Sequence, residues 1–174
     1  MKISMHTMAV DSFVPMLESL SAILDKGVAH ARQSKIDLVN ARLAPDMCTL
    51  AQQVRLACLH AEEGTSRLTG RVVQPVSDDE TTIDGLQRLI ATTLENLKGI
   101  GAAAFEGAED RDCNIPLPGK MMIAMDGLQF LRAWALPHFY FHVVTAYDIL
   151  RHSGVVIGKQ DYLSQIGNFV CPRI

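Results

Sequence analysis

The stretch from Leu128 to Gly154 constrains the fold of this chain most, because it carries a long stripe of side chains at helical spacing. Steps of three and four residues hold these side chains on one face of a helix. The stripe consists of Leu128, Leu131, Ala135, His138, His142, Thr145, Ile149 and His152. Two of its members, His138 and His142, lie one turn apart and therefore point the same way. The stretch predicts a helix whose largely apolar face is buried against other helices.

A second helix is predicted near the start of the chain, where an apolar stripe runs over residues 13–31. Asp11 or Ser12 can cap this helix, and Pro15 suits its first turn because the missing N–H of proline costs nothing there. The alternative is a start nearer Ser4 with a bend at Pro15.

A third helix is predicted to open at Thr49 and close at Gly70. The Thr49 hydroxyl can accept from the amide three residues on while the Gln52 side chain reaches back, which is the reciprocal arrangement of a capping box. At about 100° per residue, His60 lies roughly 95° from the middle of the apolar stripe of this helix. His60 is therefore expected on a flank, where it can still face a neighbouring helix.

A fourth helix is predicted from Thr81, which has Asp84 three residues later as a cap partner and is followed by a stripe over residues 83–100. Over residues 112–126 the period changes, and two short apolar runs flank a Pro118–Gly119 turn. Such a pattern is typical of a small hairpin of two strands. The sequence thus predicts an all-α four-helix bundle with a small β-hairpin before the last helix.

Length and composition restrict the organisation and the partners of the chain. Its 174 residues suffice for one buried core, so we expect a single domain over residues 1–174. The formal charge of −3 offers no basic field for a phosphate backbone, and nucleic acid is not an expected partner. No run approaches the roughly 20 apolar residues of a membrane span, and the first residues lack a secretion signal. We expect a cytoplasmic protein without a membrane partner.

The last helix carries a second apolar line in addition to its histidine stripe, made of Phe130, Trp134 and Phe141. A helix that is apolar on two sides must pack against something on each side. The other helices of the bundle cover one side, and the hairpin or a second subunit covers the other. We expect a homodimer. Pro137 removes one amide donor and predicts a kink or a fresh helix start immediately before His138.

The two histidines of the last helix can coordinate one metal ion if another part of the fold supplies a third ligand, and His60 is the candidate. Glu63, three residues after His60, can orient an imidazole or replace a weak ligand, as carboxylates next to metal ligands commonly do. Its alternative role is that of a solvated surface glutamate. The alternative is structural, because a histidine on an apolar face is often a neutral core residue hydrogen-bonded to backbone or to a hydroxyl.

Two runs of the chain resemble a known family: LPHFYFHVVTAYDILRHSGVVIGKQDYL near the end and FVPMLESLSAILDKGVAHA near the start. They are similar to an uncharacterised bacterial domain-of-unknown-function family grouped with the DinB-like, or YfiT-like, proteins. The resemblance implies a four-helix bundle, often dimeric, with a divalent metal such as zinc or nickel held by His60, His138 and His142. It also implies, from some members, thiol-dependent transfer or isomerisation of small-molecule substrates.

Two functional hypotheses follow. In the first, the chain is a metal-dependent enzyme in which an open site activates water or a small thiol for transfer or hydrolysis. In the second, it is a non-catalytic dimeric bundle that acts as a binding or stress-associated protein without metal. The sequence identifies neither a substrate nor a catalytic residue, since it contains no serine nucleophile elbow and no glycine-rich phosphate loop.

Overall fold

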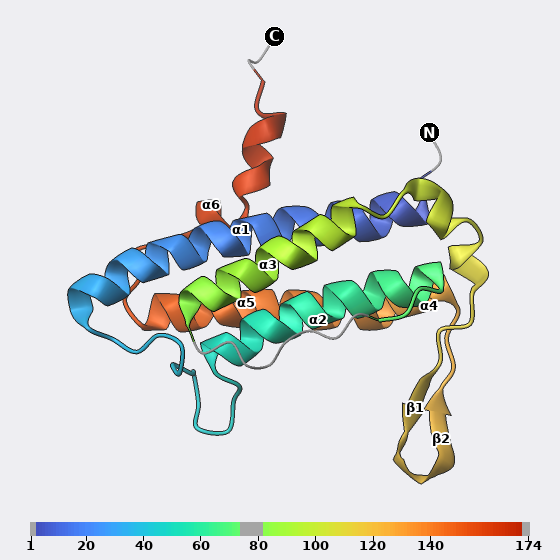
Figure 1. Cartoon of the computed structure of the whole chain (residues 1–174), viewed down its shortest axis with the longest axis horizontal. Coiled ribbons are helices and arrows are strands. Elements are labelled where there is room, and N and C mark those ends of the chain that lie inside the picture. The colour runs from blue at the N-terminus through green and yellow to red at the C-terminus, as the bar shows by residue number, and fades with distance from the viewer. Residues whose placement is uncertain (1–2, 74–81, 172–174) are drawn as a thin grey trace.

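The computed structural model describes residues 3–73 and 82–171. Its four long helices form a bundle (Figure 1). They are α1 (Met5–Ser34), α2 (Leu50–Thr69), α3 (Ile83–Lys98) and α5 (Leu136–His152). Helix α2 packs against α5 and α3, while α1 packs against α3 and α5, so the four helices surround one apolar core. The predicted all-α four-helix bundle is confirmed.

The connection between α3 and α5 contains the predicted hairpin. Strands β1 (Ile115–Leu117) and β2 (Met121–Ile123) are antiparallel, with Pro116 opposite Met122. The remaining short elements of this connection are η1 (Ala102–Phe105), η2 (Ala108–Asp110), η3 (Pro118–Lys120), α4 (Gly127–Phe130) and η4 (Leu131–Ala135). The hairpin projects from the bundle next to α4, on the side where α2 and α5 lie (Figure 1).

Helix α1 begins at the earlier of its two predicted starts. The Ser4 side chain caps the helix by accepting a bond from the Thr7 amide at 3.1 Å, a donor that the first turn would otherwise leave unsatisfied. Pro15 lies inside the helix. The predicted cap at Asp11 or Ser12 was wrong, because the hydroxyl of Ser12 instead donates to the Met8 carbonyl within the helix.

Helix α1 is also long and apolar enough to cross a membrane when judged by length and composition alone. Half of its most apolar window is buried inside the protein. Residues such as Phe13, Leu17 and Leu20 are fully enclosed by the other helices, and the core helix of a soluble protein has this same composition. The bundle therefore accounts for the apolar character of α1.

Local capping fixes the other long helices as well. Thr49 and Gln52 form the predicted capping box, with bonds of 3.3 and 2.8 Å, and Gly70 ends α2 in the left-handed conformation at a φ of 71°. At the start of α3 the cap is Thr82, which accepts from the Gly85 amide at 3.1 Å. The predicted cap residue Thr81 lies outside the described residues.

The tail after α5 is partly helical, although its apolar residues follow no sustained helical period in the sequence. It contains two short helices, α6 (Lys159–Tyr162) and η5 (Ser164–Phe169). The Asp161 carboxylate explains this order, because it accepts from the Gly158 amide at 2.7 Å and pairs with Lys26 of α1 at 2.5 Å. Ser19 and Ser164 share a further hydrogen bond of 2.7 Å. This bond and the Lys26–Asp161 ion pair hold the tail against α1.

Candidate metal centre

The backbone around Pro137 determines where the two histidines of the last helix point. Residues Leu131–Ala135 form a π-helical turn in which the Leu136 amide bonds to the Leu131 carbonyl, five residues back. Helix α5 then begins at Leu136, with Pro137 in its first turn, where no amide donor is needed. The backbone stays right-handed helical from Phe130 through Leu136, so the predicted kink or fresh start before His138 takes the form of a π turn inside a continuous helix, and this wider turn accommodates the proline.

Helices α2 and α5 bring three imidazole rings together. The ring centroid of His60 lies 4.9 Å from that of His138 and 5.3 Å from that of His142. The rings of His60 and His142 are stacked with only 5° between their planes. The flank position of His60 is thus directed toward α5, and the three candidate ligands share one site.

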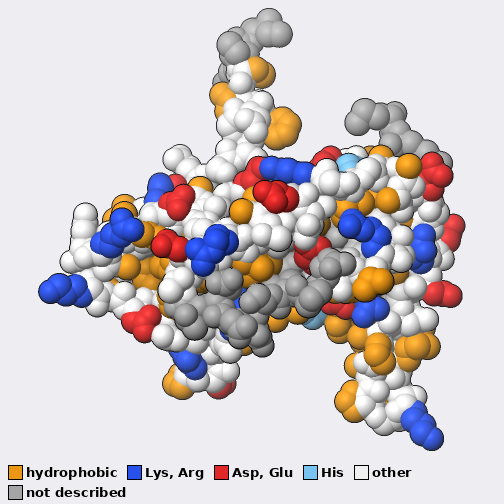
Figure 2. All heavy atoms as spheres, in the orientation of Figure 1, with side chains coloured by type: hydrophobic (Ala, Val, Ile, Leu, Met, Phe, Trp, Pro, Cys, Tyr) orange, Lys and Arg blue, Asp and Glu red, His pale blue; other side chains and the backbone are white. Residues whose placement is uncertain are grey.

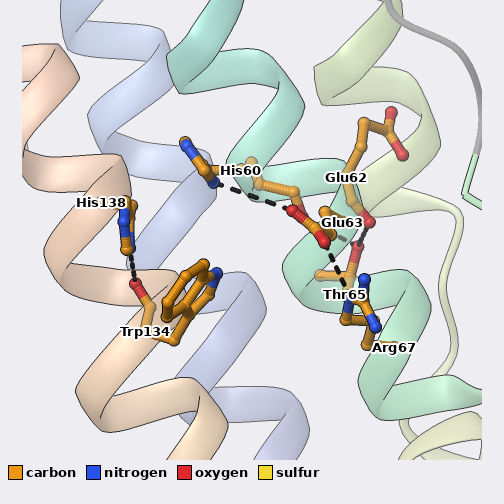
Figure 3. A network of polar contacts seen from close by, with 8 residues as sticks. His60, Glu62, Glu63, Thr65, Arg67, Trp134 and His138 are labelled. Atoms are coloured by element: carbon orange, nitrogen blue, oxygen red, sulfur yellow. Dashed lines mark hydrogen bonds and ion pairs between the residues drawn. The ribbon is translucent and has the colours of Figure 1, made fainter. Parts of the chain in front are cut away.

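Two of the rings are oriented by hydrogen bonds at Nδ1. His138 Nδ1 lies 2.7 Å from the Trp134 carbonyl oxygen, and His142 Nδ1 lies 2.7 Å from Gln53 Oε1 (Figure 3 shows the former). Gln53 Nε2 donates to the Cys48 carbonyl, which leaves its oxygen facing the imidazole. Because both partners are acceptors, each Nδ1 carries the proton in the neutral ring. The lone pair of each ring is then on Nε2.

The third ring, His60, has a carboxylate neighbour in place of a carbonyl. Its Nδ1 is 3.9 Å from Glu63 Oε2, and Glu63 Oε1 accepts from Arg67 Nε at 2.7 Å (Figure 3). Arg67 also donates to the Asn114 carbonyl at 3.3 Å, next to the hairpin. The Glu63 side chain is only 21% exposed and lies beside His60, while Arg67 holds its carboxylate and compensates its charge.

Burial keeps the rings of His60 and His142 uncharged. Desolvation lowers the pKa of His142 to about 4, helped by the neighbouring His60 and His138 rings. Desolvation also lowers the pKa of His60, with His138 acting in the same direction and Glu63 opposing it. Both groups are neutral near pH 7, and the neutral imidazole is the form that binds a metal.

The rings do not yet present a finished coordination geometry. Within residues 3–73 and 82–171, no group of three or more histidine, cysteine, aspartate or glutamate side chains is arranged to hold a metal ion. The stacked planes of His60 and His142 show the reason, because ligands of one ion must aim their nitrogens at a common point. A ring rotation, most simply of His60, is needed to bring the nitrogens into that arrangement.

The site opens to the surface through a shallow depression. Pro137, His138, Phe141 and His142 line it, and its volume is about 420 Å³. Beside it lies Trp134, whose indole Nε1 is the one buried side-chain polar atom without a partner among the described residues. The indole is 4.4 Å from the His138 ring, measured between centroids.

The sequence did not single out two groups that orient these rings, namely the Gln53 side chain and the Trp134 carbonyl. Gln53 lies seven residues before His60, which puts both on one face of α2, and Trp134 lies four residues before His138. These spacings were available in the sequence. The hydrogen bonds themselves depend on the α2–α5 packing and on the π turn.

Two other histidines, His6 and His30, have structural partners away from this site. His6 Nε2 lies 3.2 Å from the Ile100 carbonyl oxygen, with its ring against Phe105. His30 Nε2 lies 3.1 Å from the Ser153 carbonyl oxygen and so joins α1 to the end of α5. These contacts agree with the structural interpretation of a histidine beside an apolar surface.

Cys58, in the core stripe of α2, is expected to be chemically inert in the folded protein. Desolvation raises its pKa to about 12, so at pH 8 only about one molecule in ten thousand carries the reactive thiolate. Iodoacetamide at pH 8 should modify the exposed Cys171 and leave Cys58 unmodified until denaturant is added. Mass spectrometry of the peptides measures this directly. Modification of both residues at comparable rates under native conditions would contradict the buried position.

Comparison with known proteins places the chain in a family. A family model described as a domain of unknown function, DUF1993, matches residues 5–163. The chain belongs to this family. The DUF1993 protein is also similar to a solved structure, the crystal structure of a DinB family member protein from Shewanella denitrificans. The two share 40% sequence identity over 91% of this chain and 90% of that one, with a TM-score of 0.83. No curated protein matches it significantly.

Proposed function

We propose that this DinB-like protein binds a divalent metal ion through Nε2 of His60, His138 and His142. The observation that carries the proposal is the convergence of three imidazoles from two helices, with ring centroids 4.9 and 5.3 Å from that of His60. Three protein ligands that leave a further position open are the usual set of a catalytic metal site.

The donor set fits such an ion. Neutral imidazole is a preferred ligand of zinc and nickel, and low pKa values keep His60 and His142 neutral at physiological pH. Metal-binding histidines usually donate their second ring N–H to a carbonyl or carboxylate. The Trp134 carbonyl, Gln53 Oε1 and Glu63 supply such acceptors for the three rings.

The chemistry that we propose is activation of water or of a small thiol, for hydrolysis or thiol transfer. A divalent ion at this place would supply a Lewis acid that lowers the pKa of the group it contacts. The chain itself supplies the shape of the site: Pro137 and Phe141 form an apolar rim on which a small molecule can rest. Glu63 would strengthen the donor character of His60.

A specific observation favours the second candidate function, a dimeric binding protein without metal. Phe141 and Val144 of α5 are 57% and 40% exposed, which is unusual for neighbouring apolar side chains on one helix face. This alternative predicts a melting temperature that does not change with chelator. The metal-binding proposal predicts a higher melting temperature with added zinc or nickel, because a ligand that binds only the folded state stabilises it.

Histidine substitutions test the metal site directly. Protein without a histidine tag should take up one equivalent of zinc or nickel in a calorimetric titration. His138→Ala and His142→Ala should each weaken binding by roughly a hundredfold or more, because even the loss of an outer partner costs 10–100-fold. His152→Ala, at an exposed position of the same helix, is the matched control and should bind as the wild type does. Wild-type uptake below about a tenth of an equivalent would refute the proposal.

A further inference from the structure

The indole of Trp134 is a hydrogen-bond donor that the described part of the chain leaves unsatisfied. Its Nε1 is enclosed by the protein, yet no hydrogen-bond partner for it lies within residues 3–73 and 82–171. An indole nitrogen can only donate, so its partner must be an acceptor. Leaving a buried donor unpaired is costly, and folded proteins retain few such groups without a functional reason. The nitrogen therefore needs an acceptor that these residues do not supply.

Trp134 is tied to the candidate site through His138. Its carbonyl oxygen lies 2.7 Å from His138 Nδ1, and its indole packs on the same imidazole with 4.4 Å between centroids and 41° between planes. The indole thus continues the row of rings formed by His138, His60 and His142, whose neighbouring centroids are 4.9 and 5.3 Å apart. In Figure 3 the indole nitrogen is on the edge of the ring that faces α2, the helix that carries His60 and Glu63. The unpaired donor therefore lies at the candidate site.

The charges around the site favour an anion as the acceptor. The Glu63 carboxylate beside His60 is paired with Arg67 at 2.7 Å, so its negative charge is compensated. Three neutral imidazoles would leave both positive charges of a bound divalent ion uncompensated. Figure 2 shows acidic and basic side chains interspersed over one face of the bundle, so no extended acidic field on that face repels an anion.

We infer that the site takes a small carboxylate and that Trp134 Nε1 donates a hydrogen bond to one of its oxygens. This inference rests on the proposed metal site. A carboxylate has two acceptor oxygens, so one can accept from the indole while the other occupies the position that three histidine ligands leave open. The rotation of His60 that coordination requires is also the movement that gives an oxygen access to the enclosed nitrogen.

The apolar part of such a molecule lies on the rim of the depression. Pro137 and Phe141 form this rim, and the Phe141 side chain is 57% exposed. The Phe141 ring stands edge-on to His142, with centroids 5.3 Å apart and 82° between planes. Apolar surface beside a few placed polar groups is typical of ligand sites, and a water molecule would use only the polar group. A carboxylate with an apolar body uses both. Trp134 thereby positions the ligand and selects anions over uncharged molecules.

Trp134 is the only tryptophan of the chain, so its indole N–H gives a single resonance in a proton–nitrogen correlation spectrum. Benzoate, a carboxylate with an apolar ring, is the probe. Added to zinc-loaded wild type, benzoate should move this resonance downfield until it saturates, because the N–H gains a charged acceptor. Benzamide, which has nearly the same shape without the charge, should bind more weakly.

A substitution that removes only the donor isolates the hydrogen bond. Trp134→Phe keeps an aromatic ring for His138 and keeps the backbone carbonyl. Its affinity for zinc should equal that of the wild type, whereas its affinity for benzoate should fall about tenfold or more in a calorimetric titration. Tyr140→Phe is the matched control, because it removes a hydroxyl from the side of α5 opposite to His138 and His142. It should bind benzoate as the wild type does.

Zinc uptake and benzoate binding are measured separately, so the two proposals fail in different ways. Wild type that takes up no zinc overturns both. Zinc uptake with an indole resonance that benzoate leaves unmoved overturns this inference alone, and so does equal benzoate affinity in the wild type and Trp134→Phe. Equal affinity for benzamide and benzoate would contradict the selection of an anion.

Discussion

Replacing Phe139 with alanine is expected to lower the free energy of unfolding by about 3 to 5 kcal/mol. The Phe139 side chain is fully buried and packs edge-to-face on Phe13 of α1, with ring centroids 4.9 Å apart. Its removal loses both the apolar burial and this aromatic contact, and the close-packed helices leave a cavity behind. Because Phe139 directly follows His138, the same contact also fixes the direction in which α5 presents its histidines.

Urea denaturation followed by circular dichroism at 222 nm measures this loss. Phe169→Ala is the matched control, because Phe169 lies in the tail and is 80% exposed. Its free energy of unfolding should stay within about 0.5 kcal/mol of the wild type. Equal destabilisation by the two substitutions would contradict the packing of α5 against α1.

Replacing Gly127 with alanine is expected to destabilise the protein by about 3 kcal/mol or more. An added Cβ would lie 1.8 Å from the Ala108 carbonyl oxygen and 3.1 Å from Leu68 Cδ2. The first of these is a backbone atom, which cannot move aside as the end of a flexible side chain can. The start of α4 would have to separate from η2, and the hairpin connection between them would move with it.

A second glycine isolates the steric cause. Gly101 has an ordinary backbone conformation, with φ at −70°, and no atom within 4 Å of the position that a Cβ would take. Gly101→Ala should leave stability unchanged or raise it by about 0.4–1 kcal/mol, since alanine restricts the unfolded chain. Thermal melts of both variants give the comparison. If Gly127→Ala melts with the wild type, the close approach of α4 to η2 is wrong.

The bundle could be predicted from the sequence because its helices carry local signals. Apolar stripes at steps of three and four identified all four long helices, and Thr49 and Gly70 marked both ends of α2. The Pro118–Gly119 turn between short apolar runs identified the hairpin. Such signals arise within a few residues of the chain and do not depend on the tertiary fold.

Features that depend on distant contacts could not be predicted in the same way. The order in the tail comes from Asp161, whose ion pair reaches 135 residues back to Lys26. The π turn before Pro137 adjusts the helix to a proline inside a packed bundle, and the proline alone predicted only a kink or a fresh start there. For α1, the local sequence did not distinguish a helix start near Ser4 from one at Asp11 or Ser12.

The candidate site combines a feature that local spacing predicts with features that depend on how the helices pack. The spacing of His138 and His142 predicted that they share a face, and the structure brings His60 to them from α2 despite its flank position. How close His60 would come depended on the rotation of α2 against α5, which no local pattern encodes. The orientation of the rings by Gln53 and the Trp134 carbonyl follows from that same packing.

The most direct test of the central claim is a crystal structure of protein grown with zinc, with anomalous diffraction collected on both sides of the zinc absorption edge. The account predicts one anomalous peak about 2.0–2.1 Å from Nε2 of His60, His138 and His142, with the His60 ring rotated out of its stack on His142. A map with no peak among these three rings, although zinc was present in the crystal, would contradict it.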